Sequence, residues 1–394
     1  VRERRRVVRF ISRTPRRRSS CASRLLTAGG VTPNSRAAAA RLRCRATSAN
    51  RFRSEKPSIA HSFMLLDSFL KVTTGLLSRK PNRLFHELDF KQHREASMFE
   101  GFTDASAYVD GIRIHAIKGG SGPALLLLHG HPQTHAIWHK VAPALAGHFT
   151  VIAADLRGYG DSGKPQGTAD HANYSKRRMA LDQVELMRSL GFASFAVIGH
   201  DRGGRVAARM ALDHPDAVTC LVTLDVAPTL AMYEKTSFEF ARAYWHWFML
   251  IRPAPFPETL IRADPDLYLK QTMGARSAGL APFTAAAYAE YLRCVSDPDT
   301  AHGICEDYRA SVTIDLEHDR ATLAAQQQIA CPFMALWGAD GVIEKCFDPL
   351  AEWRPYAPHV QGQALSCGHY IAEEAPQLLL EHILPFLTTQ AITA

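Results

Sequence analysis

The residues best placed to do chemistry in this 394-residue chain form the run Gly199-His200-Asp201-Arg202-Gly203-Gly204. The run follows an apolar segment of strand length at 195–198 and precedes a segment with helical periodicity at 206–214. A tight turn between strand and helix lifts its central side chain over the edge of a sheet, and the flanking glycines permit close packing. The same turn directs the following backbone N–H, that of Arg202, toward developing negative charge.

A carboxylate at the centre of such a turn predicts attack on saturated carbon. Asp201 would displace a leaving group and remain linked to the substrate as an ester. The alternative is that Asp201 only caps the helix that follows, a common role for aspartate. The combination of strand, glycines and helix favours the nucleophile.

Such an ester must be hydrolysed, so we expect a histidine base near the end of the chain. His369 follows the expected last strand at 360–365 and precedes a helix expected at 376–387. Asp225 and Asp340 both stand at the ends of expected strands, and either could orient this base. Spacing alone does not choose between them, and either could instead be a turn residue.

A second loop, His129-Gly130-His131-Pro132, directly follows the apolar segment at 124–128. We expect the backbone N–H of His131 to complete an oxyanion hole with that of Arg202. The alternative is a plain Gly-Pro turn. The loop at 155–162, after the next expected strand, is interpreted as structural.

Short apolar runs alternate with helical segments from about residue 107 onward. Strands are expected at 124–128, 149–154, 195–198, 220–224, 333–337 and 360–365. This alternation predicts an α/β fold with a mostly parallel, doubly wound sheet. Between residues 227 and 329 the chain is rich in aromatics and proline and lacks strand-like runs, which predicts an inserted helical cap. The core would then comprise 98–226 and 330–394.

The positive charge of the chain is confined to its first quarter. Residues 1–97 hold 23 Lys and Arg against 6 Asp and Glu, whereas the remainder holds 23 against 32. We expect this basic extension to be disordered, either as an organellar transit peptide or as a region upstream of a start at Met98. Neither nucleic acid nor membrane is therefore an expected partner of the folded part.

The cysteines give no sign of a metal site or a disulfide framework. None of the eight lies in a Cys-x-x-Cys pair or at metal-type spacing from histidine. We expect reduced thiols, no metal, no cofactor and a cytoplasmic location, unless the basic extension is a genuine transit peptide.

These motifs resemble the haloacetate dehalogenases, especially the fluoroacetate dehalogenases, of the α/β-hydrolase superfamily. The resemblance extends over nearly all of residues 98–394 and is carried by several short stretches. They are 129–135 with Trp138, 155–162, 200–205, 224–229, 246–247, 307–309 and 368–369. Arg202 stands where related haloalkane dehalogenases and many epoxide hydrolases usually have tryptophan.

The resemblance implies a role for each matching residue. Asp201 would be the nucleophile, His369 the base and Asp225, rather than Asp340, its acid partner. Arg202 and Arg205 would bind the substrate carboxylate. The halide would be held by His246, Trp247 and Tyr308 from the cap.

The implied reaction converts a short haloacid and water into a hydroxy acid and halide, with the haloacid as the small-molecule partner. A homodimer is compatible with this role. One departure is His131, at a position where a bulky apolar or aromatic residue is expected more often, so its side chain would change the polarity of the pocket.

Two other functions compete with dehalogenation. An epoxide hydrolase would use the same Asp and His with cap tyrosines as acids; the candidates are Tyr244, Tyr268, Tyr288, Tyr291 and Tyr308. Arg202 and Arg205 weigh against it, because a neutral epoxide offers them no charge to bind. A non-catalytic binding protein with this fold would tolerate loss of a triad member, and here every member is present.

Overall fold

A computed structural model describes residues 98–393 of the chain, with side chains up to residue 390. The expectations for residues 1–97 lie outside the described part. Within the described part, no helix is long and apolar enough to cross a membrane.

An eight-stranded sheet with the order β1-β4-β6-β5-β7-β8-β9-β10 forms the centre of the fold. Its six central and C-terminal strands are β5 (Ala124–Leu128), β6 (Thr150–Ala154), β7 (Phe195–His200), β8 (Val218–Leu224), β9 (Phe333–Gly338) and β10 (Gln361–Leu365). These six pair in parallel, whereas β4 (Ala116–Gly119) runs antiparallel to β6 and β1 (Thr103–Asp104) antiparallel to β4. A short hairpin of β2 (Ala107–Val109) and β3 (Ile112–Ile114) lies apart from the sheet. The expected α/β-hydrolase fold with a mostly parallel sheet is confirmed.

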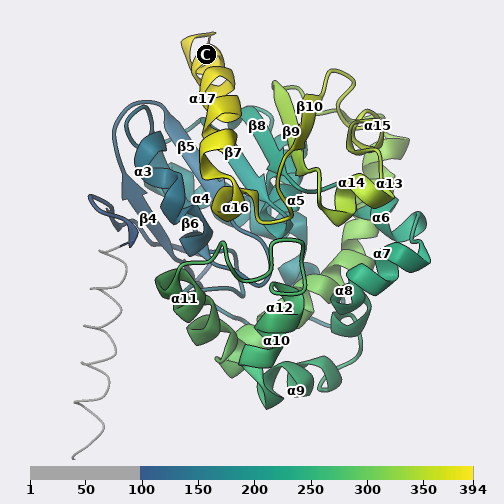
Figure 1. Cartoon of the computed structure of the whole chain (residues 1–394). Helices are drawn as coiled ribbons and strands as arrows, with labels where there is room; N and C mark the ends of the chain where they lie inside the picture. Colours follow the sequence, from purple (N-terminus) through teal and green to yellow (C-terminus); the bar gives the residue numbers. More distant parts are fainter. Residues whose placement is uncertain (1–97, 394) are drawn as a thin grey trace, which may run out of the picture. The chain divides into compact units, whose positions relative to one another are not determined.

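Helices on both faces explain why the central strands are continuously apolar. All five residues of β5 are buried, as expected of a strand with no solvent-facing side. Figure 1 shows α16 (Ile371–Glu374) and α17 (Pro376–Thr393) in front of the sheet, with α4 (Lys176–Ser189) and α5 (Arg202–Asp213) behind it. The smaller α3 (Ala142–Leu145) and the 3-10 helices η1 (His135–Lys140) and η2 (Ala172–Tyr174) lie in the connections.

Helix α5 begins four residues earlier than the periodicity of the sequence predicts. The expected start was residue 206, whereas the structure places it at Arg202. Gly203 and Gly204 occupy the first turn, and glycine is a poor helix former, so the sequence signal is weak there. The earlier start places Arg202 itself within the helix that follows Asp201.

The segment between β8 and β9 is entirely helical or irregular in the structure. It forms α6 (Thr229–Glu234), α7 (Phe238–Ala243), α8 (Trp245–Leu250), α9 (Phe256–Ala263), α10 (Pro265–Thr272), α11 (Ala285–Val295), α12 (Pro298–Val312) and α13 (Ile314–Ala324). After β9 follow the short α14 (Val342–Cys346) and α15 (Pro349–Trp353). The domain boundaries expected at 98, 227 and 330 stay predictions, because helices and strands alone do not mark where a folding unit ends.

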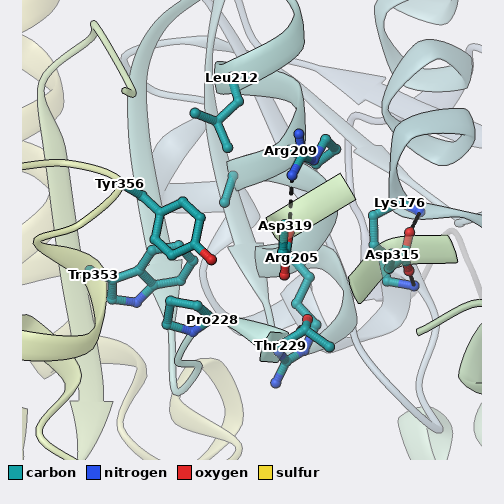
Figure 2. A pocket seen from close by; sticks show the side chains of 11 residues that line it. Lys176, Arg205, Arg209, Leu212, Pro228, Thr229, Asp315, Asp319, Trp353 and Tyr356 are labelled. Atoms are coloured by element: carbon teal, nitrogen blue, oxygen red, sulfur yellow. Dashed lines mark hydrogen bonds and ion pairs between the residues drawn. The ribbon is translucent and has the colours of Figure 1, made fainter. Parts of the chain in front are cut away.

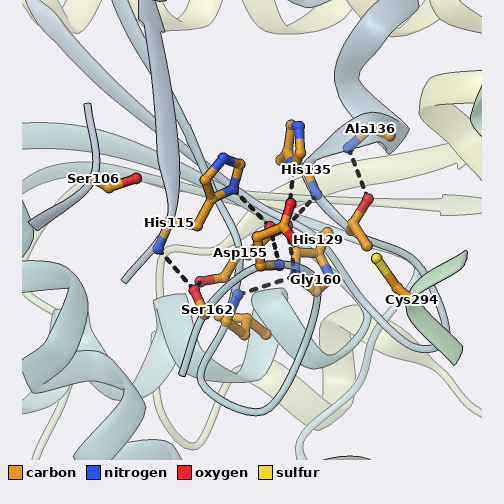
Figure 3. Close-up of polar contacts among 12 residues, drawn as sticks. Ser106, His115, His129, His135, Ala136, Asp155, Gly160, Ser162 and Cys294 are labelled. Carbon is orange, nitrogen blue, oxygen red and sulfur yellow. Dashed lines mark hydrogen bonds and ion pairs between the residues drawn. The ribbon is translucent and has the colours of Figure 1, made fainter. Parts of the chain in front are cut away.

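A buried hydrogen-bonded hub fixes the loops beneath the carboxyl end of the sheet. Asp155, just after β6, accepts from Nδ1 of His115 at 2.8 Å and from Nδ1 and backbone N of His135 at 3.0 and 2.8 Å. The backbone N–H of Asp161 adds a further donor at 3.0 Å. Figure 3 shows these contacts converging on Asp155. The hub ties the start of β4, the loop after β5 and the loop after β6 together, in line with the structural interpretation of residues 155–162.

Candidate active site

Asp201 lies in the sharp turn between β7 and α5. Its backbone has φ 44° and ψ −111°, a left-handed conformation that is costly for a non-glycine residue. The residue occupies the N-cap position of α5, yet its side chain makes no capping hydrogen bond. Instead Oδ2 accepts a hydrogen bond from the backbone N–H of His131 at 3.2 Å. The capping alternative therefore does not account for this side chain.

His369 and Asp225 form a buried hydrogen-bonded pair beside Asp201. His369, between β10 and α16, places Nδ1 2.5 Å from Oδ2 of Asp225, and the other Asp225 oxygen accepts from the backbone N–H of Gly338 at 2.9 Å. Asp340 is exposed and makes only backbone contacts. The ambiguity that spacing left is thus resolved geometrically in favour of Asp225 as the partner of His369.

The charges around Asp201 keep its carboxylate ionised. Burial alone would raise the pKa of Asp201, but the charges of His369, Arg205 and Arg202 outweigh it and lower that pKa well below its ordinary value. An ionised oxygen is what a nucleophilic carboxylate requires.

The two backbone N–H groups expected to form an oxyanion hole belong to the loop after β5 and to the start of α5. The backbone N–H of His131 contacts Asp201 directly, as described above. Arg202 is the first residue of α5, and the first four N–H groups of a helix have no intrahelical acceptor. The role of these two N–H groups as an oxyanion hole stays a prediction.

Arg202 and Arg205 both project from the first turns of α5 and are fully buried, but their surroundings differ. Asp307 of α12 accepts from Nε and Nη2 of Arg202, both at 2.8 Å. Nη1 of Arg202 and Nε of Arg205 have no hydrogen-bond partner among the described residues. Arg205 otherwise contacts the carbonyl of Ala227 and the hydroxyl of Thr229. Each guanidinium therefore keeps one buried donor that a bound anion would satisfy.

The cap brings His246, Trp247 and Tyr308 against these two arginines. The guanidinium carbon of Arg202 lies 4.1 Å from the ring centre of Tyr308, and that of Arg205 lies 4.7 Å from Trp247. The ring of Tyr308 lies 6.1 Å from that of His246 and 6.1 Å from that of Trp247. Within the described part of the chain, Nδ1 of His246, Nε1 of Trp247 and the Tyr308 hydroxyl are buried without partners. The structure thus brings all the predicted site residues together.

Sequence reasoning missed several groups that shape this site. His200, inside the nucleophile run, places Nε2 2.9 Å from the carbonyl of His369 and so anchors the loop of the base. Arg276, in the loop after α10, lies over the ring of Tyr244 at 4.2 Å. Asp307 was noted only as part of a matching stretch. His200 could have been suspected from its place in the run, whereas an arginine in an irregular cap loop gives no such signal.

A separate, partly open cavity of about 30 Å³ lies beside Arg205 (Figure 2). Its polar lining includes Lys176, Arg209, Asp315 and Asp319, and it contains none of the Asp201, Asp225 and His369 side chains. A volume of this size holds about two waters and no substrate. It is not the catalytic pocket.

The hub at Asp155 is the one group of described residues with spacing that could suit a metal ion. The ligand atoms of His115, His135 and Asp155 lie within 4.8 Å of one another. Both oxygens of Asp155 already accept hydrogen bonds from protein donors. The donors satisfy the carboxylate without an ion, and we interpret the cluster as structural.

Comparisons with known proteins agree with this geometry. A family model described as alpha/beta hydrolase fold matches residues 123–376. The chain is 46% identical over 292 residues to a fluoroacetate dehalogenase of Burkholderia sp, covering 74% of this chain and 95% of that protein. It is 36% identical over 289 residues to a soluble epoxide hydrolase of Corynebacterium sp. (strain C12), covering 72% and 96%. A solved alpha/beta-hydrolase structure from Nostoc sp PCC 7120 matches with TM-score 0.71 and 52% identity, covering 73% and 98%.

The chain belongs to the α/β-hydrolase family and is a hydrolase of that fold. Its resemblance to the fluoroacetate dehalogenases, inferred from motifs, is confirmed.

Proposed function

We propose that this protein hydrolyses the carbon–halogen bond of a short 2-haloacid, such as fluoroacetate or chloroacetate. The observation that carries the proposal is a cluster of buried, unpartnered donors around an ionised Asp201. Two belong to Arg202 and Arg205 and suit a carboxylate, while three belong to His246, Trp247 and Tyr308 and suit a departing halide. A buried hydrogen-bond donor without a partner is energetically unfavourable, so we expect these donors to bind a ligand.

The first step is an in-line displacement at the halogen-bearing carbon. Oδ2 of Asp201 is held by the His131 N–H, so the other oxygen, Oδ1, is the attacking atom. The carbon–halogen bond breaks with its electron pair on the halide, and Oδ1 becomes the ester oxygen. The arginines orient the substrate carboxylate for this attack, which lowers the entropic cost of the reaction.

The cap donors stabilise charge that appears only as the halide departs. Burial raises the pKa of Tyr308 well above its ordinary value, so its hydroxyl stays protonated and can donate. Burial, together with the charge of Arg276, lowers the pKa of His246 well below its ordinary value. His246 therefore acts as a neutral imidazole donor.

The second step hydrolyses the ester. His369 takes a proton from water, and the resulting hydroxide attacks the Asp201 ester carbon. The charge that develops on Oδ2 is held by the His131 N–H. The bond between Cγ and Oδ1 then breaks, and the departing alkoxide takes the proton back from the imidazole of His369 and leaves as the hydroxy acid. The hydroxyl on Cγ loses its remaining proton to water, which restores the carboxylate. Asp225 stabilises the imidazole while it is protonated.

Epoxide hydrolysis is the second candidate, favoured by the Corynebacterium relative and by four buried cap tyrosines, Tyr244, Tyr268, Tyr291 and Tyr308. Tyr268 already engages His131, with its hydroxyl 2.8 Å from Nε2. The Tyr291 hydroxyl donates to Glu373, so the hydroxyls of Tyr244 and Tyr308 are left without a partner among the described residues. What weighs against an epoxide is that the two arginines would have no anion to bind.

The test measures halide release by the full chain from fluoroacetate and chloroacetate, alongside diol formation from a neutral epoxide such as styrene oxide. We expect halide and hydroxy acid in equal amounts and no diol. Turnover of the epoxide with no halide from either acid would establish the second candidate instead.

A further inference from the structure

The imidazole of His131 is a fourth polar side chain beside the proposed halide site, in addition to His246, Trp247 and Tyr308. Its ring lies 5.7 Å from that of His246 with an interplanar angle of 20°, and 5.4 Å from that of Tyr308 at 83°. The side chain is almost fully buried. His131 thus contacts two of the three residues assigned to the halide, in addition to its backbone contact with Asp201.

Tyr268 of α10 fixes which ring nitrogen of His131 carries the proton. The Tyr268 hydroxyl lies 2.8 Å from Nε2. Burial raises the pKa of Tyr268 well above its ordinary value, and burial lowers the pKa of His131 to about 3. Donation from Nε2 to the phenol oxygen would leave the Tyr268 hydroxyl hydrogen without an acceptor among the described residues, so the assignment that satisfies both groups has the phenol as donor and the single N–H of the neutral imidazole at Nδ1. This Nδ1 is buried and has no partner among the described residues.

We propose that the Nδ1–H of His131, oriented by Tyr268, is a fourth hydrogen-bond donor to the departing halide and biases the enzyme toward fluoride. The inference rests on the proposed function and adds a residue pair to it. Fluoride is the smallest halide, the strongest hydrogen-bond acceptor and the poorest leaving group, so its departure gains most from one more donor. No proton is transferred in this step, because the donor keeps its hydrogen and the halide leaves as an anion.

The proposal is tested with Tyr268→Phe, His131→Phe and the double variant, assayed on fluoroacetate, chloroacetate and bromoacetate. Tyr268→Phe should lower kcat/KM about tenfold for fluoroacetate and less than about threefold for bromoacetate, because only the orientation of one donor is lost. His131→Phe, which keeps the backbone N–H, should cost on the order of 100-fold on fluoroacetate. The double variant should be no worse than His131→Phe alone, since the two side chains act through one hydrogen bond.

Tyr288→Phe is the matched control. It removes a hydroxyl from the same cap, but that hydroxyl contacts Asp266 at 2.8 Å rather than the site. Its kcat/KM values should rank fluoroacetate, chloroacetate and bromoacetate in the same order as those of the wild type. If Tyr268→Phe lowers kcat/KM equally for all three acids, or does not lower it, the proposal is overturned. Tyr268→Phe keeps the test decisive if His131→Phe does not fold.

Calorimetric titration with sodium fluoride and sodium bromide separates this inference from the proposed function. Weaker fluoride binding by Tyr268→Phe, with bromide binding retained, supports the donor even if no haloacid is hydrolysed. Haloacid turnover with unchanged halide preference in Tyr268→Phe overturns the donor and leaves the proposed function standing. A wild type that neither binds fluoride nor releases halide overturns both.

Discussion

Asp201 combines a strained backbone with an ionised, uncapped side chain. Strain at a positive φ costs on the order of 1–3 kcal/mol and persists where the surroundings hold it. Here β7, α5 and the His131 N–H hold it, and the result is a carboxylate presented to a set of donors. The two-step chemistry proposed for it predicts distinct defects for the nucleophile and the base.

Asp201→Asn should abolish halide release, because a neutral amide is a far weaker nucleophile. His369→Asn should instead release one equivalent of halide and then stop, because the ester forms and is not hydrolysed. Mass spectrometry of the intact His369→Asn protein after incubation with haloacetate should show one added carboxymethyl group. An unmodified mass together with lost activity would contradict the role of His369.

Asp307 predicts a large effect on stability. Its buried carboxylate contacts Arg202, Lys176 and the Tyr159 hydroxyl, and those cations hold its pKa well below the ordinary value despite burial. Asp307→Asn leaves two buried cations undercompensated, which should cost about 3–5 kcal/mol of unfolding free energy in urea denaturation.

The exposed pair Arg320–Glu234 provides the control for this measurement. Glu234→Gln should change the unfolding free energy by less than about 0.5 kcal/mol, because solvent screens an exposed pair. Equal effects of the two substitutions would contradict the assignment of Asp307 as a buried anchor.

At the scale of elements, the site depends on how closely α5 approaches the end of β5. A Cβ on Gly203 would lie 2.4 Å from the carbonyl oxygen of Leu128 and 2.5 Å from that of His129. The helix bearing Arg202 and Arg205 and the loop bearing His131 can therefore meet only if residue 203 has no side chain. This contact aligns the nucleophile with one half of the oxyanion hole.

Gly203→Ala should force the two elements apart, costing about 1–3 kcal/mol in stability. It should also lower kcat at least about tenfold, since small displacements of catalytic groups are costly. Urea denaturation and steady-state kinetics measure the two effects. Gly147→Ala is the control, because its Cβ would lie 3.3 Å from its nearest neighbour at an exposed position. A fully active Gly203→Ala would show that the close approach is dispensable.

At the scale of the whole molecule, Glu373 joins three parts of the fold in one buried contact. The carboxylate of this α16 residue accepts from Gln133 at 2.5 Å and from the Tyr291 hydroxyl of α11 at 3.1 Å. Burial raises its pKa to about 8, against the opposing effects of Tyr291, Lys140 and Gln133. A cap helix, the loop after β5 and the helix after His369 therefore meet at a titratable group.

This raised pKa predicts that stability falls as pH rises. The folded state binds the Glu373 proton more tightly than the unfolded state, so the stabilisation is fully present below about pH 4.5 and is lost through about pH 8. Between pH 5 and pH 8.5 the wild type should lose on the order of 3 kcal/mol more unfolding free energy than Glu373→Gln. Urea denaturation of both proteins at the two pH values checks this. An equal change in unfolding free energy with pH in the two proteins would contradict it.

The sequence by itself determined the sheet and the identity of most site residues. Continuous apolar runs of strand length favour central strands covered on both faces, and the glycine-flanked Asp201 follows one of them directly. Local patterns of this kind can be interpreted without knowledge of the fold. They failed at the start of α5, where two glycines weaken the helical pattern, and at the N-terminal antiparallel strands, which are short and half-exposed.

Only the tertiary structure decided which residues meet across the chain. Asp225 and Asp340 are equivalent in spacing, but one reaches His369 and the other faces solvent. The pairing of Arg202 with Asp307 and of His131 with Tyr268 joins positions more than a hundred residues apart. Such contacts depend on how the cap packs onto the sheet. No local periodicity in the sequence predicts that packing, because the packing depends on the side chains of the cap and of the sheet together.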